Sequence, residues 1–107
     1  YVPVVTGRVT RTMLRGELYD LVNYLAEHEF WNAQVQQIHV RDDQRIELVP
    51  RVGDALILLG DTHNYQVKLD RLLRLYQKAF NVMGWNGYQL LDLQYDNQIV
   101  ATKKKDS

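Results

Sequence analysis

Near its C-terminal end, the sequence has two runs of strand-forming residues on either side of a candidate turn. Tyr88–Tyr95 and Gln98–Thr102 flank Asp96 and Asn97, two residue types that tolerate the positive φ of a tight hairpin loop. The chain is therefore expected to contain a sheet that ends in a hairpin. With a two-residue loop, one face of this hairpin is mostly apolar and carries Leu91, Leu93, Tyr95 and Val100. The other face is mixed and carries Leu90, Asp92, Gln94, Ile99 and Ala101.

The second strand of the hairpin is predicted to form an edge of the sheet, because only residues 103–107 follow Gln98–Thr102 in this sequence. An edge strand presents unpaired backbone N–H and C=O groups that can pair with another chain. A two-residue loop makes Gln98 and Val100 the residues that hydrogen-bond within the hairpin. Ile99 and Ala101 are then predicted to point their N–H groups outward, toward a partner strand.

The composition is that of one small globular domain. The 107 residues can enclose one hydrophobic core, and contents of 46% hydrophobic and 24% charged residues are ordinary for such a fold. The 13 basic and 13 acidic residues cancel, which argues against nucleic acid as a partner. The sequence has no cysteine, which excludes disulfides and thiolate ligands. It also has no apolar run near the ~18 residues that indicate a membrane-spanning helix.

Two amphipathic helices are predicted from apolar residues that recur at helical spacing. The first begins at Leu14 and ends near His28 or Glu29. Its inward stripe consists of Leu14, Leu18, Leu21, Val22 and Leu25. The second begins after Asp61 or Asn64, either of which can cap it, and ends at Gly84. Its inward stripe consists of Leu69, Leu72, Leu73, Tyr76, Phe80 and Met83. Its predicted water-facing residues are Lys68, Asp70, Arg71, Arg74 and Lys78.

The segments between the helices have the patterns of β-strands. Phe30–Val40 and Arg45–Val49 alternate in polarity, Asp42–Asp43 turns the chain between them, and Pro50 ends the second strand. Ala55–Leu59 is an unbroken apolar run, as expected of a central strand that is covered on both faces. Alternation places Val35, Gln37 and His39 on one face of the first strand and Gln36, Ile38 and Val40 on the other. In the second strand, the predicted inward residues are Ile46 and Leu48.

Together these elements predict an α+β domain over residues 1–107, monomeric in isolation. Its sheet is mixed and mostly antiparallel, with about five strands and two helices in the order helix-β-β-β-helix-β-β. Ala55–Leu59, the second helix and Tyr88–Tyr95 read as a β-α-β crossover, which makes those two strands parallel and leaves Gln98–Thr102 outermost. The apolar segment Tyr1–Gly7 either adds a short edge strand or docks a preceding domain.

Residues that usually carry catalysis or bind metals are scattered. His28, His39 and His63 fall on three different elements and show none of the spacings of a metal-binding motif. Trp31 and Trp85 have two readings, anchors for a partner or core residues, and their places beside predicted strands favour the core. The sequence therefore predicts no catalytic residue, no cofactor and no metal site.

Three short motifs occur in the same order as in a known protein family. They are Val2–Gly7 at the start, Val52–Gly60 ahead of Lys68-Leu69 and Leu72, and Asp92-Leu-Gln-Tyr95 near the end. In this order and spacing the chain resembles the FtsQ/DivIB family of bacterial cell-division proteins, from Val2 to Thr102. The likeness is to the C-terminal β domain of the extracytoplasmic region. A POTRA domain and a transmembrane helix precede that domain in family members, and neither lies within these 107 residues.

The resemblance implies a non-enzymatic divisome scaffold at the division septum, on the periplasmic face of the inner membrane and anchored through the missing N-terminal helix. Its implied partners are FtsB-like and FtsL-like proteins, with an extended FtsB segment adding a strand along the last strand of the domain. Tyr95 matches the tyrosine of the family's Asp-x-Arg-Tyr motif, and Gln94 occupies the position where arginine is common. The expected partner-binding residues are Tyr95, Asp96, Asn97, Gln98, Ile99, Val100, Ala101 and Thr102.

Two other classes of function fit the same scaffold. One is a POTRA-like module that accepts unfolded client strands, which a single preferred partner sequence would argue against. The other is a small-ligand-binding or enzymatic α+β domain, which a cavity lined by Tyr, Trp and His would favour.

Overall fold

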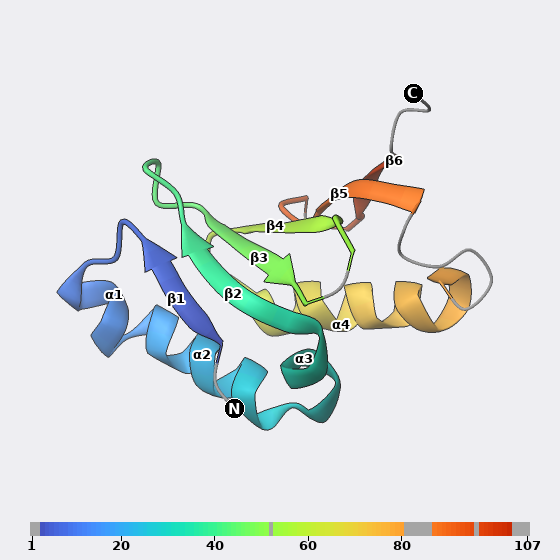
Figure 1. The fold of residues 1–107 in the computed structure, drawn as a ribbon. Coiled ribbons are helices and arrows are strands. Elements are labelled where there is room, and N and C mark those ends of the chain that lie inside the picture. The colour runs from blue at the N-terminus through green and yellow to red at the C-terminus, as the bar shows by residue number, and fades with distance from the viewer. Residues whose placement is uncertain (1–2, 52, 81–86, 96, 104–107) are drawn as a thin grey trace.

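The computed structural model of the protein describes residues 3–51, 53–80, 87–95 and 97–103, which form one sheet with helices packed against one of its faces (Figure 1). Six strands lie side by side in the order in which they occur along the chain, from β1 to β6. The pairs β1–β2 and β4–β5 are parallel, and the other three pairs are antiparallel. The elements are β1 (Val4–Gly7), α1 (Arg11–Arg15), α2 (Glu17–Glu27), α3 (Glu29–Gln34), β2 (Val35–Val40), β3 (Ile46–Pro50), β4 (Leu56–Gly60), α4 (Tyr65–Leu75), a π-helical turn η1 (Tyr76–Phe80), β5 (Tyr88–Asp92) and β6 (Val100–Lys103).

The predicted α+β class and the mixed, mostly antiparallel sheet are confirmed. The described residues contain six strands and four α-helices, against the predicted five and two. The added strand is β1, which corresponds to the edge strand that was one of two readings of the N-terminal segment. The added helices are α1 and α3, both too short to show a full apolar stripe.

The first predicted helix is divided in the structure. Gly16 separates α1 from α2, and Thr10 caps α1 by accepting a hydrogen bond from the backbone N–H of Met13 at 3.2 Å. Leu14, predicted to face the core, lies on α1 with 49% of its surface exposed. The rest of the stripe is correct, and α2 buries three leucines completely or nearly so, Leu18, Leu21 and Leu25.

The first half of the predicted strand Phe30–Val40 is helical. His28 ends α2 and starts α3, where its Nδ1 accepts a hydrogen bond from the backbone N–H of Trp31 at 3.4 Å. This short helix turns Trp31 into the core, where its side chain is fully buried, as predicted. Trp85, the other tryptophan predicted to be internal, lies outside the described residues.

A register shift in β2 explains why Val35 does not lie on the face predicted for it. Val35 pairs with Pro50, but the next pair joins Gln37 with Val49, so Gln36 is the extra residue of a bulge. The bulge changes the alternation once, and Val35 therefore shares the buried face with Ile38 and Val40.

The middle of the sheet follows the prediction closely. Ile46 and Leu48 of β3 are buried, and β4 lies between β3 and β5, parallel to β5. Coverage of β4 differs from the prediction, because the helices lie on one face only (Figure 1). Ile57 and Leu59 point into the core, whereas Leu56 and Leu58 lie half-buried on the opposite face.

Lys68 on α4 is buried, although its place opposite the leucine stripe predicted exposure. Only 8% of its surface is exposed, and its ammonium group donates to the Leu59 carbonyl at 3.4 Å and to Asp61 Oδ1 at 3.2 Å. These contacts hold the start of α4 against the end of β4. The stripe prediction is correct for the buried side chains Leu69, Leu72 and Tyr76. Met83 and the predicted cap Gly84 lie outside the described residues, as does the side chain of Phe80.

Gly7 allows β1 to meet β2. Its φ is +92°, and a Cβ atom there would lie 2.0 Å from the carbonyl oxygen of Val40. That carbonyl accepts a hydrogen bond from the backbone N–H of Arg8 at 2.9 Å. The backbone contact with β2 therefore continues one residue beyond the end of β1. A residue with a side chain could not adopt this position without displacing one strand.

Candidate partner-binding edge of the sheet

Strand β6 is one of the two edges of the sheet, and β1 is the other (Figure 1). β6 pairs with β5 on one side, and all four of its residues are exposed. Val100, at its start, has 40% of its surface exposed. The outermost position predicted for this strand is confirmed, with bounds shifted by one to two residues.

The predicted two-residue loop is wrong. The observed pairs are Asp92 with Val100, Leu91 with Ala101 and Leu90 with Thr102. The chain leaves β5 after Asp92 and re-enters the ladder only at Val100, because the residues after Asp92 have other partners. Leu93 is buried at 1% exposure and donates its backbone N–H to the Leu58 carbonyl of β4 at 2.9 Å.

The changed register also places each side chain of β6 on the face opposite to the one predicted, relative to β5. The reason is that successive side chains of a strand point to opposite sides. Ala101 now lies on the helix-covered face, beside Leu91. Ile99, just before the strand, is partly buried and packs against the core. Val100 lies on the opposite face, beside Asp92, and not with Leu91 as predicted.

Backbone directions along β6 follow from one hydrogen bond on β5. Since the N–H of Leu93 points toward β4, alternation turns the backbone groups of Asp92 and Leu90 toward β6. Their partners, Val100 and Thr102, are then the hydrogen-bonded residues, and Ala101 directs its N–H and C=O outward. The inward direction of Val100 and the outward direction of Ala101 were also predicted, although on the assumption of a two-residue loop. Ile99 precedes the strand, so its backbone is not part of the regular edge.

The remaining predicted site residues lie in the connection between β5 and β6. Tyr95 has 48% of its surface exposed, and Asn97 and Gln98 are exposed as well. Asp96 lies outside the described residues. The structure thus brings Tyr95 and residues 97–102 to one border of the sheet, as predicted.

A groove beside this connection was missed by the sequence prediction. It has a volume of about 320 Å³ and lies between α4 and the β5–β6 connection. Its lining residues are Arg71, Arg74, Leu75 and Lys78 from the helical side and Asn97, Gln98 and Ile99 from the connection. The three cations recur at helical spacing on one face, which is a signal for a basic stripe, but only the tertiary fold places that stripe next to the edge.

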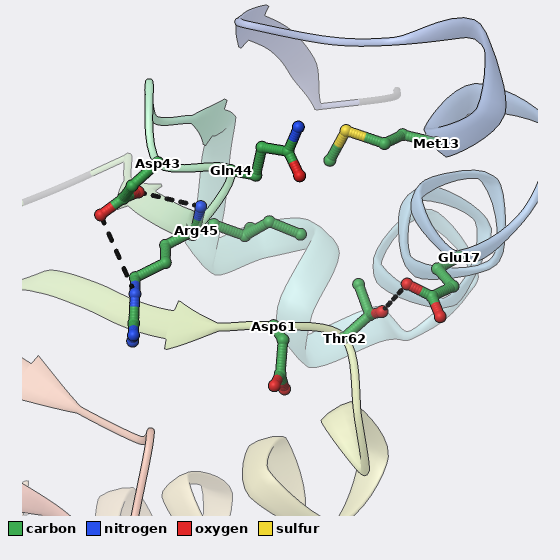
Figure 2. A pocket seen from close by; sticks show the side chains of 8 residues that line it. Met13, Glu17, Asp43, Gln44, Arg45, Asp61 and Thr62 are labelled. Atoms are coloured by element: carbon green, nitrogen blue, oxygen red, sulfur yellow. Dashed lines mark hydrogen bonds and ion pairs between the residues drawn. The ribbon is translucent and has the colours of Figure 1, made fainter.

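A second cavity, of about 370 Å³, lies at the tip of the β2–β3 hairpin and contains the side chains of Glu17, Asp43 and Asp61 (Figure 2). Each carboxylate already has a partner. Thr62 donates its hydroxyl to Glu17, Arg45 lies 3.8 Å from Asp43, and the Lys68 ammonium bonds Asp61. Among the described residues, no group of three or more His, Cys, Asp or Glu is arranged to hold a metal ion.

The three histidines are dispersed, as predicted. His28 caps α3, and His39 on β2 lies with its Nδ1 2.9 Å from the Thr6 hydroxyl of β1. His63 lies in the turn before α4, where its Nε2 is 3.2 Å from the Asn64 side-chain amide. In the described part of the chain, no helix is long and apolar enough to cross a membrane.

Comparison with known proteins supports the resemblance noted from the sequence motifs. No curated protein matches the chain. A family model described as FtsQ/DivIB, C-terminal related, matches residues 1–102. The chain therefore belongs to the FtsQ/DivIB C-terminal related family, whose members are non-enzymatic scaffold proteins of cell division.

Proposed function

We propose that the domain binds an FtsB-type divisome protein by accepting an extended segment of it along β6. The observation that carries this proposal is the outward N–H and C=O of Ala101, in the middle of a fully exposed edge strand. A segment pairing there would extend the sheet by one strand, with backbone hydrogen bonds supplying affinity and alternate side chains supplying specificity.

Backbone pairing with β6 alone gives too little affinity. The strand has four residues, so only every second one presents its backbone to a partner, and each hydrogen bond contributes a net ~1 kcal/mol. Immobilising a peptide costs several kcal/mol, so side-chain contacts must supply the rest. The exposed ring of Tyr95 and the basic groove next to β6 are the nearest surfaces that can do so.

The groove indicates the character of those contacts. Partner side chains on the helix-covered side of the extended sheet would point toward Arg71, Arg74 and Lys78, with Ile99 at the same border. Three cations around a partly apolar groove favour a segment in which acidic residues alternate with apolar ones. An FtsL-type protein would join the same assembly through the bound FtsB-type partner.

In the cell, we place this interaction on the periplasmic face of the inner membrane, at the septum. Membership of a cell-division family supports this position. The alternative of a ligand-binding domain finds no support in the two cavities described above, since neither is lined by tryptophan, tyrosine or histidine.

The proposal is tested by amide hydrogen exchange of the domain with and without a synthetic peptide. The peptide covers the C-terminal extracytoplasmic segment of the FtsB protein encoded in the same genome. We expect new protection at the outward amide of Ala101 and unchanged exchange in β1 at the opposite edge. Protection at β1, or no protection anywhere at saturating peptide, would contradict strand addition at β6.

A further inference from the structure

The side chain of Gln94 links three parts of the sheet at the point where the chain leaves β5. Its Nε2 donates to Asp92 Oδ1 at 3.2 Å, and its own backbone N–H donates to the same oxygen at 3.0 Å. Its Oε1 accepts a hydrogen bond from Nη1 of Arg45, which lies just before β3. The amide therefore bridges a cation and a carboxylate from two different elements.

Gly60, the last residue of β4, makes room for this side chain. Its φ is +83°, and a Cβ atom there would lie 2.8 Å from Cγ of Gln94. The aliphatic part of Gln94 thus crosses the end of β4, between Arg45 on one side and Asp92 on the other. These contacts with Arg45, Asp92 and Gly60 hold the side chain of Gln94 in one conformation.

We propose that Gln94 is a positioning residue for the partner-binding edge, an inference that rests on the function proposed above. The connection from Leu93 to Val100 is held at its ends by the buried side chain of Leu93 and the partly buried Ile99. Of the described residues between these two, only Gln94 has side-chain hydrogen bonds to other described residues. It determines the direction in which the chain leaves the sheet, and with it the position of the neighbouring Tyr95.

The chemistry of the amide is specific to this position. A carboxylate at residue 94 could still accept from Arg45 but would repel Asp92, and a hydrocarbon could bond neither. Nε of Arg45 lies 3.8 Å from Oδ2 of Asp43, so this ion pair already holds the guanidinium group close to Gln94. A loop that is already in its bound conformation loses less entropy when a partner arrives, which raises affinity without adding a contact.

The test is calorimetric titration of the same FtsB peptide into the intact domain and five variants, one of them a control. Gln94→Met keeps the packing over Gly60 and removes both side-chain hydrogen bonds. Gln94→Glu keeps the acceptor for Arg45 but replaces the donor to Asp92 with a negative charge. Arg45→Met and the double variant Arg45→Met/Gln94→Met complete a double-mutant cycle. Gln36→Met, at an exposed glutamine of β2 on the far side of the sheet, is the matched control.

We expect Gln94→Met to raise the Kd by roughly three- to tenfold, within the range for coupled neighbours, and the double variant to be no worse. The thermal midpoint and the control should remain close to wild type. In the free domain, amide exchange at residue 94, whose N–H donates to Asp92, should be faster in Gln94→Met, with β3 and β4 unchanged. A wild-type domain that does not bind the peptide would overturn the proposed function but not this local effect. Unchanged exchange at residue 94, or additive losses in the cycle, would overturn the positioning role.

Discussion

Replacing Ala101 by proline should weaken partner binding while leaving the fold nearly intact. In the structure, Ala101 directs its N–H away from β5, so the substitution removes no hydrogen bond of the ladder. Proline also places its ring where the partner backbone must approach. Edge strands tolerate proline at such positions, because the missing donor faced solvent.

The magnitude follows from the bond that is lost. Removing one donor leaves a carbonyl of the partner buried without its hydrogen bond, which costs about 1–3 kcal/mol. This corresponds to a roughly 5- to 150-fold increase in Kd. The assay is calorimetric titration of the FtsB peptide, with thermal unfolding of each variant measured in parallel.

Thr102→Pro is the matched control, because the Thr102 N–H faces Leu90 in the ladder. This variant should lower the unfolding free energy by about 1–3 kcal/mol, or the midpoint by roughly 4–8 °C per kcal/mol for a domain of this size. A folded Ala101→Pro protein that binds as tightly as wild type would refute strand addition. Equal destabilisation by both prolines would refute the assigned direction of the Ala101 N–H.

Three further predictions concern other parts of the molecule. Gly7→Ala should cost more than about 2 kcal/mol of stability in chemical denaturation, because the added carbon meets the Val40 carbonyl and the φ is positive. Partial burial acts to raise the pKa of Asp61, but the Lys68 hydrogen bond and charge prevail and hold it below its usual value. Because that pKa is lowered by folding, its stabilisation should be complete above about pH 4 and fade on further acidification. Asp61→Asn should thus lose under about 1 kcal/mol at pH 7 and almost nothing at pH 2, as read from denaturant titrations. Arg74→Glu should weaken peptide binding severalfold at low salt and less at high salt, whereas equal losses at both would argue against an acidic partner segment.

The parts of the fold that were predicted correctly are those in which one local pattern determines burial. The leucines of α2 and the alternation of Ile46 and Leu48 needed no information from distant segments. Leu14 was misplaced because Gly16 interrupts the helix at a position where the apolar spacing continues.

Other features depend on contacts between distant segments. The bulge at Gln36 inverts the face of Val35, and simple alternation cannot show an inserted residue. Lys68 is buried because a carbonyl of β4 and the carboxylate of Asp61 accept its hydrogen bonds, which only the folded chain brings together.

The outermost strand was predicted correctly, but the details of the hairpin were not. Asp96 and Asn97 have the chemistry of a tight turn, yet Leu93 pairs with β4 and Gln94 with Asp92 and Arg45. These tertiary contacts outweigh the local turn preference and lengthen the connection, which is why the register differs by one residue from the prediction.

The agreement between sheet order and chain order has a consequence for folding. Every strand pairs only with its neighbours in sequence, so the sheet can grow from the β2–β3–β4 meander outward. Both parallel pairings must close crossovers of equal length, residues 8–34 and 61–87, which makes them slower steps of comparable entropic cost. Strand β6 joins the sheet only through β5, so the edge that is proposed to recruit a partner is attached to the core only once the second crossover has closed. A chain whose second crossover is still open would therefore offer an edge that is not attached to the core, and stable recruitment would report on closure of that crossover.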